Sequence, residues 1–248
     1  MSSEKPSIIS LVPSLTELLI DLGLHGQLVG RTRFCVHPRE KVENIPIVGG
    51  TKNPRLDKIH NIDPDYIIAN KEENRPEDIN QLTADSEVII TEIETIEDAL
   101  IAIHNLAQTF NVSETAEQLI TDIQQRLEER PDETELRTAY MIWKDPWMSV
   151  GHDTYINDVL EHWNLPNVFN SESRYPTFEL ESLKSYNPDL VLLSSEPYPF
   201  KEKHIAVVKE ACPAARVLVV EGEWFSWYGS HMKHAFGRLN SWRKTIAD

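Results

Sequence analysis

The chain has 248 residues, with 24 Lys and Arg against 40 Asp and Glu, which gives a formal net charge of −16. Because 40% of the residues are hydrophobic and 26% are charged, the chain can build a large core, which excludes wholesale disorder. No stretch gathers the basic residues that would neutralise phosphates, which excludes a nucleic-acid-binding protein.

The sequence also allows predictions about membrane segments, secretion and disulfide bonds. Uncharged stretches such as residues 6–16 are much shorter than the about 20 apolar residues of a membrane span, so no transmembrane segment is predicted. The start of the chain lacks the basic, apolar and small-residue regions of a secretory signal. Cys35 and Cys212 permit at most one disulfide, and because nothing in their spacing requires it, free thiols are predicted.

The first half of the chain alternates short apolar runs with helical patterns. Residues 8–12 are predicted to form a strand, and a helix begins at residue 13, where Ser14 and Glu17 have the spacing of a capping box. Strands are then expected at 28–30, 66–69 and 88–90, and helices at 56–62 and 75–82. This alternation predicts a mainly parallel sheet that is covered by helices on both faces.

Two helices are predicted in the middle of the chain. The first spans residues 95–110, and the second begins at Ser113, a predicted N-cap, and continues to about residue 130. The strand and helix alternation then resumes. Strands are expected at 139–143, 190–193 and 217–220, and helices at 155–163, 180–186, 204–211 and 230–246.

The two halves of the chain resemble each other after a shift of 124 residues. Each half contains a helix, a Pro-Asp turn and a buried strand in the same order. One alternative is that unrelated helix-to-strand units share this punctuation, since Pro-Asp favours turns. A duplication instead predicts two similar α/β lobes at 1–112 and 133–248, a connecting helix at 113–132, and a ligand between the lobes. The matched pairs are Leu56 and Leu180, Pro64 and Pro188, Asp65 and Asp189, and Glu72 and Glu196.

Sequence motifs of common catalytic sites are missing. The chain contains no G-x-S-x-G, G-x-x-x-x-G-K-[ST], G-x-G-x-x-G, H-E-x-x-H or C-x-x-C. Ser14 lies between a predicted strand and a predicted helix, where helix capping explains it without a nucleophilic role. The protein is therefore not predicted to be an enzyme.

The nine histidines are candidate metal ligands, because neutral imidazole is the commonest transition-metal ligand. His231 and His234 lie three residues apart near the start of the last helix, and His37 and His152 lie in predicted loops. The sequence shows no tight cluster with a carboxylate, so ordinary polar or capping roles are the alternative. Solvent-facing positions are predicted for His60, His104, His162 and His204.

Aromatic residues gather in two predicted loops. Trp143 and Trp147 flank Lys144-Asp145-Pro146, and residues 224–228 contain four aromatic side chains between a strand and a helix. Large flat side chains at the mouth of a pocket bury a rigid ligand with little loss of entropy. Core packing is the alternative role. It is predicted for Trp143, Trp163 and Trp242, whereas a pocket position is predicted for Trp147, Trp227 and Tyr228.

Nine short motifs, spread over nearly the whole chain, carry a family resemblance. They are ISLVPSLTE (9–17), VGRT (29–32), HP (37–38), GGTKNP (49–54), NIDPD (61–65), SVG (149–151), SRYP (173–176), SSEP (194–197) and WFSWYGS (224–230). Together they resemble the class III periplasmic binding proteins, the helical-backbone receptors for vitamin B12, ferric siderophores, haem and some metal ions. The resemblance is closest to the cobalamin-binding branch.

This resemblance implies two α/β lobes joined by one long backbone helix, with the ligand in the cleft between them. The implied ligand is a metal chelate, a corrinoid first and a ferric siderophore or haem otherwise, with no intrinsic cofactor. An ABC permease dimer is the implied partner of a monomeric periplasmic or cell-surface protein, although a chain without a signal segment leaves a cytoplasmic location open. The alternatives are a receptor for a bare metal ion through histidines, and a cytoplasmic chelate-handling protein or enzyme on the same scaffold.

The resemblance also implies roles for particular residues. Phe34 falls where an aromatic contacts the corrin, and Thr51 and Lys52 fall near another contact. Because Thr51-Lys52 replaces a frequent aromatic, Lys52 and Arg33 are candidates for binding the anionic groups of a siderophore or a nucleotide-loop phosphate. The remaining predicted ligand contacts are Trp147, Tyr175, Trp227, Tyr228 and His231. The predicted permease-docking residues, one for each lobe, are Glu72 or Glu73 and Glu196 or Glu202.

Overall fold

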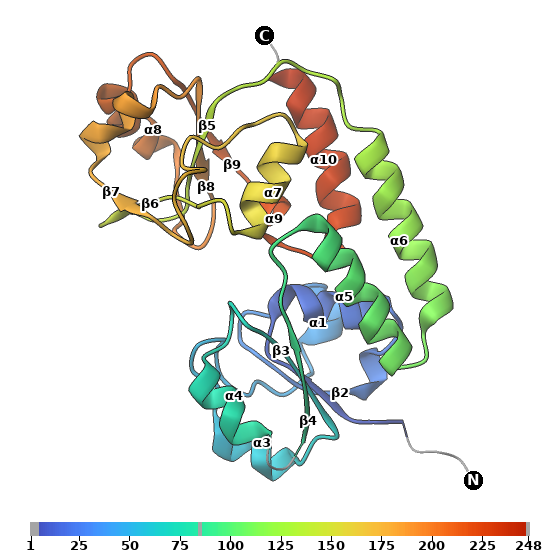
Figure 1. Cartoon of the computed structure of the whole chain (residues 1–248). Helices are drawn as coiled ribbons and strands as arrows, with labels where there is room; N and C mark the ends of the chain where they lie inside the picture. The colour runs from blue at the N-terminus through green and yellow to red at the C-terminus, as the bar shows by residue number, and fades with distance from the viewer. Residues whose placement is uncertain (1–4, 84–85, 247–248) are drawn as a thin grey trace. The chain divides into compact units, whose positions relative to one another are not determined.

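The computed structural model describes residues 5–83 and 86–246. These residues form two compact units, each with its own parallel sheet (Figure 1). The chain passes between the units several times, and helix α6 (Ser113–Glu128) contributes residues to both. Unit 1 consists of Met1–Ile93, Asp98–Thr121 and Tyr228–His231, and unit 2 consists of Glu94–Glu97, Asp122–Trp227 and Met232–Asp248.

In the described part of unit 1, four parallel strands form one sheet in the order β2-β1-β3-β4. The central strands β1 and β3 consist mainly of isoleucine and other apolar residues, which suits strands that are covered on both faces. The strands are β1 (Ile8–Ser10), β2 (Leu28–Arg31), β3 (Tyr66–Asn70) and β4 (Glu87–Thr91).

Alternating side chains of these strands build two faces of the sheet. Ile9 and Ile67 pack with Ile59 of α3 and Ile79 of α4 in one core cluster. Ile68 has the opposite alternation and lies on the other face, where Figure 1 shows α1 and α5. The helices are α1 (Pro13–Asp21), η1 (His25–Gln27), α2 (Arg39–Val42), α3 (Leu56–Ile62), α4 (Pro76–Leu82) and α5 (Ile96–Thr109).

In the described part of unit 2, three parallel strands form the main sheet in the order β5-β8-β9, and β6 and β7 form an antiparallel pair. Met141 and Leu193 face Leu183 and Val208 in one core cluster. The strands are β5 (Thr138–Met141), β6 (Trp147–Met148), β7 (Thr177–Phe178), β8 (Leu190–Ser194) and β9 (Arg216–Val220). The helices are α7 (Tyr155–His162), η2 (Leu180–Tyr186), α8 (Glu202–Ala211), α9 (Glu223–Ser226) and α10 (His231–Thr245).

The repeat is visible at the corner between helix and strand in each unit. Asp63 ends α3 in the left-handed region at φ 53°, and Asn187, 124 residues later, ends η2 at φ 50°. The Asp65 carboxylate then accepts a hydrogen bond from the Ser7 backbone N–H at 2.7 Å, and Asp189 accepts one from Arg137 at 2.9 Å. Matching positions therefore turn the chain and fasten it to the start of the first strand of each sheet, which confirms the prediction of two similar α/β units.

One local prediction is wrong, and two further details of the helices are not visible in the sequence pattern. The capping box at Ser14 and Glu17 does not form, because Val12 is the N-cap of α1 and makes no side-chain capping hydrogen bond. Pro13 occupies the first turn instead, where its missing N–H needs no partner. The helix predicted at residues 180–186 forms with the same bounds, as a 3-10 helix. The sequence also gives no sign of helix α9, because four residues are too few to show a helical period.

Two further predictions, free cysteines and the absence of a transmembrane helix, can be compared with the structure. Cys35 and Cys212 are both buried and free, as expected for thiols used as small apolar side chains. Burial raises the pKa of the Cys35 thiol, and hydrogen bonds from Thr16 and Thr32 only partly oppose this. Among the helices in residues 5–83 and 86–246, none combines the length and the apolar character needed to cross a bilayer.

Candidate ligand-binding edges

Each unit presents a set of loops at one edge of its sheet. Parallel strands carry all their carboxyl ends to the same side, so the loops that follow them lie close together. Edge 1, in unit 1, consists of residues 32–35, 49–54 and 70–74. Edge 2, in unit 2, consists of residues 143–147, 194–200 and 221–227.

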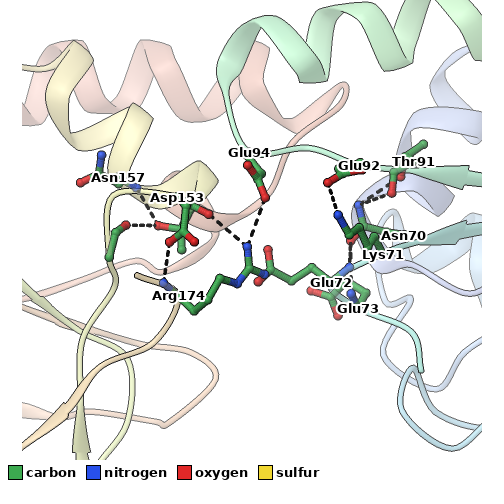
Figure 2. Close-up of polar contacts among 12 residues, drawn as sticks. Asn70, Lys71, Glu72, Glu73, Thr91, Glu92, Glu94, Asp153, Asn157 and Arg174 are labelled. Carbon is green, nitrogen blue, oxygen red and sulfur yellow. Dashed lines mark hydrogen bonds and ion pairs between the residues drawn. The ribbon is translucent and has the colours of Figure 1, made fainter. Parts of the chain in front are cut away.

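The loops of edge 1 are fastened to one another by polar side chains. Asn74 Nδ2 donates to the Thr51 carbonyl at 3.0 Å, and Lys52 Nζ donates to the Glu72 carbonyl. Asn70 Oδ1 accepts from the backbone N–H groups of Glu72 and Glu73 at 2.9 and 3.2 Å (Figure 2). This bonding fixes the turn that carries both predicted docking glutamates, and the two side chains are partly exposed.

Phe34 and Arg33 stand out on edge 1. The Phe34 side chain is 51% exposed, and the Arg33 guanidinium carbon lies 5.6 Å from the centre of its ring. Gly50 lies directly beside this pair, since a Cβ atom there would be 3.3 Å from both side chains. Behind it, Thr32 Oγ1 lies 3.1 Å from the buried Cys35 sulfur. A flat apolar surface with a cationic group therefore projects from a rigid loop.

Edge 2 carries a row of aromatic side chains. The Trp143 ring meets Tyr198 edge-on at 5.7 Å, and Tyr198 contacts Phe200 at 4.6 Å. Phe200 stacks on Trp147 at 5.9 Å, and Lys144 Nζ lies 5.8 Å from the Trp147 ring. The core position predicted for Trp143 is wrong, because its side chain is 40% exposed. Its strand-like pattern is misleading, since β5 ends at Met141 and Trp143 makes only an isolated bridge to Met148 before the turn at residues 144–146.

The last predicted aromatic contacts lie deeper. Trp227 is 9% exposed and Tyr228 is 7% exposed. Trp227 Nε1 donates to Glu196 Oε1 at 3.1 Å, and Ser226 Oγ donates to the same oxygen at 2.7 Å. Burial raises the pKa of the Glu196 carboxyl, the negative charges of Glu223 and Glu221 act in the same direction, and these two hydrogen bonds oppose the rise.

Tyr175 lies next to an arginine in unit 2. The Arg174 guanidinium carbon is 5.7 Å from the Tyr175 ring centre, and Arg174 Nη1 lies 3.2 Å from Glu94 Oε1 (Figure 2). The Arg174 backbone has φ 56°, and its N–H donates to Asp153 Oδ1 at 2.5 Å. The Tyr175 side chain is half-buried. Its contact with a ligand stays a prediction.

Among the candidate metal ligands, His231 and His152 contact other groups of the protein. His231 Nδ1 lies 3.0 Å from Glu17 Oε2, where both side chains are mostly buried, and His152 Nδ1 lies 2.7 Å from the Glu172 carbonyl. In the part of the chain that the structure describes, no three His, Cys, Asp or Glu side chains are grouped as a metal ion would require. His37 is partly exposed and His234 is exposed.

The structure also shows the exposure of His204 and of the two docking candidates in unit 2, Glu196 and Glu202. The solvent-facing position predicted for His204 is wrong, because this side chain is 8% exposed and its Nδ1 accepts from the Lys201 backbone N–H at 2.9 Å. Of the two docking candidates in unit 2, Glu202 is exposed at the start of α8. Glu196 is partly buried against Trp227 instead.

Three relevant features of unit 2 are missed by sequence reasoning. The row formed by Tyr198 and Phe200 brings together rings that are distant in sequence from Trp143, so no local pattern reveals it. Arg174 is placed by its positive φ, a conformation that arginine rarely adopts and that the sequence does not indicate. Gly222 gives a usable signal as a glycine just after a strand, which often marks close backbone approach.

Comparisons with known proteins agree with this architecture. A family model described as periplasmic binding protein matches residues 8–212. The chain is 23% identical over 233 residues to the vitamin B12-binding protein of Pectobacterium carotovorum subsp. carotovorum (strain PC1), which covers 91% of this chain and 83% of that protein. It is 24% identical over 206 residues to the uncharacterized ABC transporter substrate-binding lipoprotein YvrC of Bacillus subtilis (strain 168), which covers 77% of this chain. The matched region spans 64% of the length of that lipoprotein.

A solved structure shows the same fold over the whole chain. The periplasmic haem-binding protein RhuT of Roseiflexus sp. RS-1, in its apo form, aligns with a TM-score of 0.85 at 17% identity and covers 99% of this chain and 100% of that one. The curated relatives are named as binding proteins rather than enzymes, in agreement with the prediction from the missing catalytic motifs. The match of the family model over most of the sequence, together with two α/β units built on parallel sheets, shows that the chain belongs to the periplasmic binding protein family and has the class III fold.

Proposed function

We propose that this protein is the substrate-binding protein of an ABC importer and that it captures a metal chelate with a flat, largely apolar body. A corrinoid is the first candidate, and haem and ferric siderophores belong to the same class. The chelate is cargo, and the protein needs no cofactor of its own. The names of the relatives support the class, since they include vitamin B12-binding, haem-binding and ABC transporter substrate-binding proteins.

The observation that carries this proposal is the exposed pair of Phe34 and Arg33 on edge 1. An aromatic ring left half in water contributes little to the core, whereas covering it with a flat ligand removes apolar surface from water on both partners. The guanidinium beside it suits a carboxylate or phosphate on the ligand's rim. On edge 2, Trp143 offers a second exposed ring.

Titration calorimetry tests the ligand class directly. We expect one of cyanocobalamin, hydroxocobalamin, haemin or ferrichrome to bind with a dissociation constant of about 1 µM or lower, which corresponds to about −8 kcal/mol. The same ligand at a hundredfold excess over its dissociation constant should stabilise the fold by about 2.7 kcal/mol in a thermal unfolding experiment. Absence of heat and of a thermal shift with all four chelates would sink the proposal.

The importer part of the proposal concerns location and partner. The protein would act as a monomer outside the cytoplasmic membrane and deliver its ligand to a permease dimer. The relatives support this, because one is named a lipoprotein of an ABC transporter and another is named periplasmic. Fractionation of cells that express the natural gene, followed by an immunoblot, should find the protein in the periplasmic or surface fraction. Recovery in the cytoplasm alone would favour a chelate-handling role inside the cell.

A further inference from the structure

The Glu196 side chain contacts the segment that follows β9, at residues 222–227. Its Oε1 atom accepts from Ser226 Oγ at 2.7 Å and from Trp227 Nε1 at 3.1 Å. Gly222 allows this approach, because a Cβ atom there would come within 2.5 Å of Glu196 Cγ and of Ser194 Oγ. The polar end of Glu196 is thus used inside unit 2, where it fastens α9 and the indole that follows it.

The other side of α9 is held by apolar contacts. Phe225 is completely buried and contacts the rings of Tyr140 at 5.1 Å and Trp242 at 6.0 Å. Tyr140 Oη in turn donates to Ser194 Oγ at 3.1 Å, two residues before Glu196. The backbone of α9 therefore has an apolar anchor at Phe225, whereas the Trp227 indole donates a hydrogen bond to the carboxyl group of Glu196.

The charges around Glu196 argue against a docking role for it. The ionised groups that act on its carboxyl are Glu221 and Glu223, both acidic, and Ser195 Oγ donates to Glu221 Oε1 at 2.5 Å. A docking carboxylate must reach an arginine of the permease, whereas this oxygen already accepts two internal hydrogen bonds. In unit 1, the equivalent residue Glu72 is bound through its backbone atoms at the Asn70 turn.

We propose that Glu196 is a positioning residue that orients the Trp227 indole for ligand binding, and that it is not a permease-docking residue. This inference rests on the proposed function, because it treats the Trp227 indole, which is 9% exposed, as part of the ligand-binding surface of edge 2. Its physical basis is local: one carboxyl oxygen collects two donors, one from the end of α9 and one from the residue after it. A glutamine at this position keeps an acceptor oxygen and loses the charge, whereas an alanine loses both.

The test uses the full chain with four variants, Glu196→Gln, Glu196→Ala, Ser226→Ala and Trp227→Phe. The probe is whichever of cyanocobalamin, hydroxocobalamin, haemin or ferrichrome binds the unchanged protein. We expect Glu196→Gln to bind within about twofold of the unchanged protein and Glu196→Ala to bind about tenfold more weakly. Adding Glu196→Ala to Trp227→Phe should cost much less than it does alone, because the indole donor is already absent. Additive losses, or unchanged binding by Glu196→Ala, would overturn the positioning role.

Stimulation of permease ATPase activity at saturating ligand separates positioning from docking. A positioning residue predicts full stimulation by Glu196→Gln, whereas loss of stimulation with unchanged affinity would show that the charge docks the permease.

Near-UV circular dichroism gives a readout that needs no ligand. Glu196→Ala, and to a smaller extent Ser226→Ala, should change the indole bands, whereas Glu196→Gln should preserve them. If no chelate binds, the proposed function fails while the spectra still decide whether Glu196 orients Trp227. If Glu196→Ala does not fold, Ser226→Ala and Glu196→Gln provide the comparison.

Discussion

At the scale of single residues, Phe34 is the sharpest test of edge 1. We expect Phe34→Ala to weaken chelate binding by about 1–3 kcal/mol through loss of ring contact, with little change in the free energy of unfolding, because the ring is 51% exposed. Titration calorimetry and thermal unfolding measure the two effects. Val36→Ala is a matched control, since Val36 is 46% exposed in the same loop and carries no ring. Equal losses for both variants would contradict a specific stacking role.

His204 gives a prediction about pH. Burial lowers the pKa of the His204 imidazole below its ordinary value of 6.5, and the nearby charge of Lys203 adds to this. Below that ordinary value, the unfolded chain takes up a proton that the folded protein resists, so folding stability is lost as the pH falls. We expect the unchanged protein to lose thermal stability relative to His204→Asn between about pH 8 and about pH 5. Asn is chosen because its Oδ1 can replace Nδ1 as the acceptor for the Lys201 N–H. Parallel pH profiles for the two proteins would contradict the prediction.

At the scale of elements, two glycines predict opposite effects of the same substitution. Gly237 lies inside α10, and a Cβ atom there would meet the Arg126 side chain at an ordinary 3.7 Å, so Gly237→Ala should stabilise the protein by about 0.5–1 kcal/mol. Gly23 ends α1 at φ 84°, so Gly23→Ala should destabilise it by about 1 kcal/mol although nothing lies within 4 Å. Urea unfolding measures both changes, and the same sign for both would refute the argument.

The turn between helix and strand at the Pro-Asp pair is repeated in both units, where it makes the same kind of hydrogen bond. Asp65 accepts from Ser7, so its carboxylate joins the start of β3 to the start of β1. Asp189 accepts from Arg137 and joins the start of β8 to the start of β5 in the same way. The backbone N–H of Ser7 holds the pKa of the exposed Asp65 carboxyl below its ordinary value. Such a corner needs a short acceptor just after proline, which explains why the Pro-Asp pair occurs twice at a spacing of 124 residues.

At the scale of the whole molecule, the proposed docking to a permease gives a prediction for three acidic side chains, of which Glu202 is exposed and Glu72 and Glu73 are partly exposed. Replacing Glu72, Glu73 and Glu202 together by Ala should reduce permease stimulation by about tenfold or more, since each loses a charge that an arginine would pair with. Ligand affinity should stay within about twofold, because Ala keeps the backbone atoms through which Glu72 and Glu73 are bound to Lys52 and Asn70. Glu210→Ala is the control, as Glu210 is an exposed acid on the same helix as Glu202. Unimpaired stimulation by the triple variant would refute the choice of residues.

Much of the architecture can be predicted from residue patterns. The helix expected at 56–62 agrees with α3 to the residue, and the strands and most helices agree within a few residues, because apolar periodicity and proline or glycine punctuation are local. The errors occur where a local pattern is incomplete. Ser14 has a capping-box partner in sequence but follows Pro13, and Trp143 continues an apolar run beyond the end of β5.

Residue patterns alone establish the fold class, the repeat and the family resemblance, since each is written in features that act over short stretches of chain. Folding of each unit then selects which of the predicted side chains are exposed and which are enclosed. Phe34 and Trp143 project into solvent, whereas Glu196 meets Trp227 through a contact between residues 31 positions apart. Exposure and pairing depend on which loops the strand ends bring together, and that geometry is set by packing of the whole unit rather than by any local run of residues.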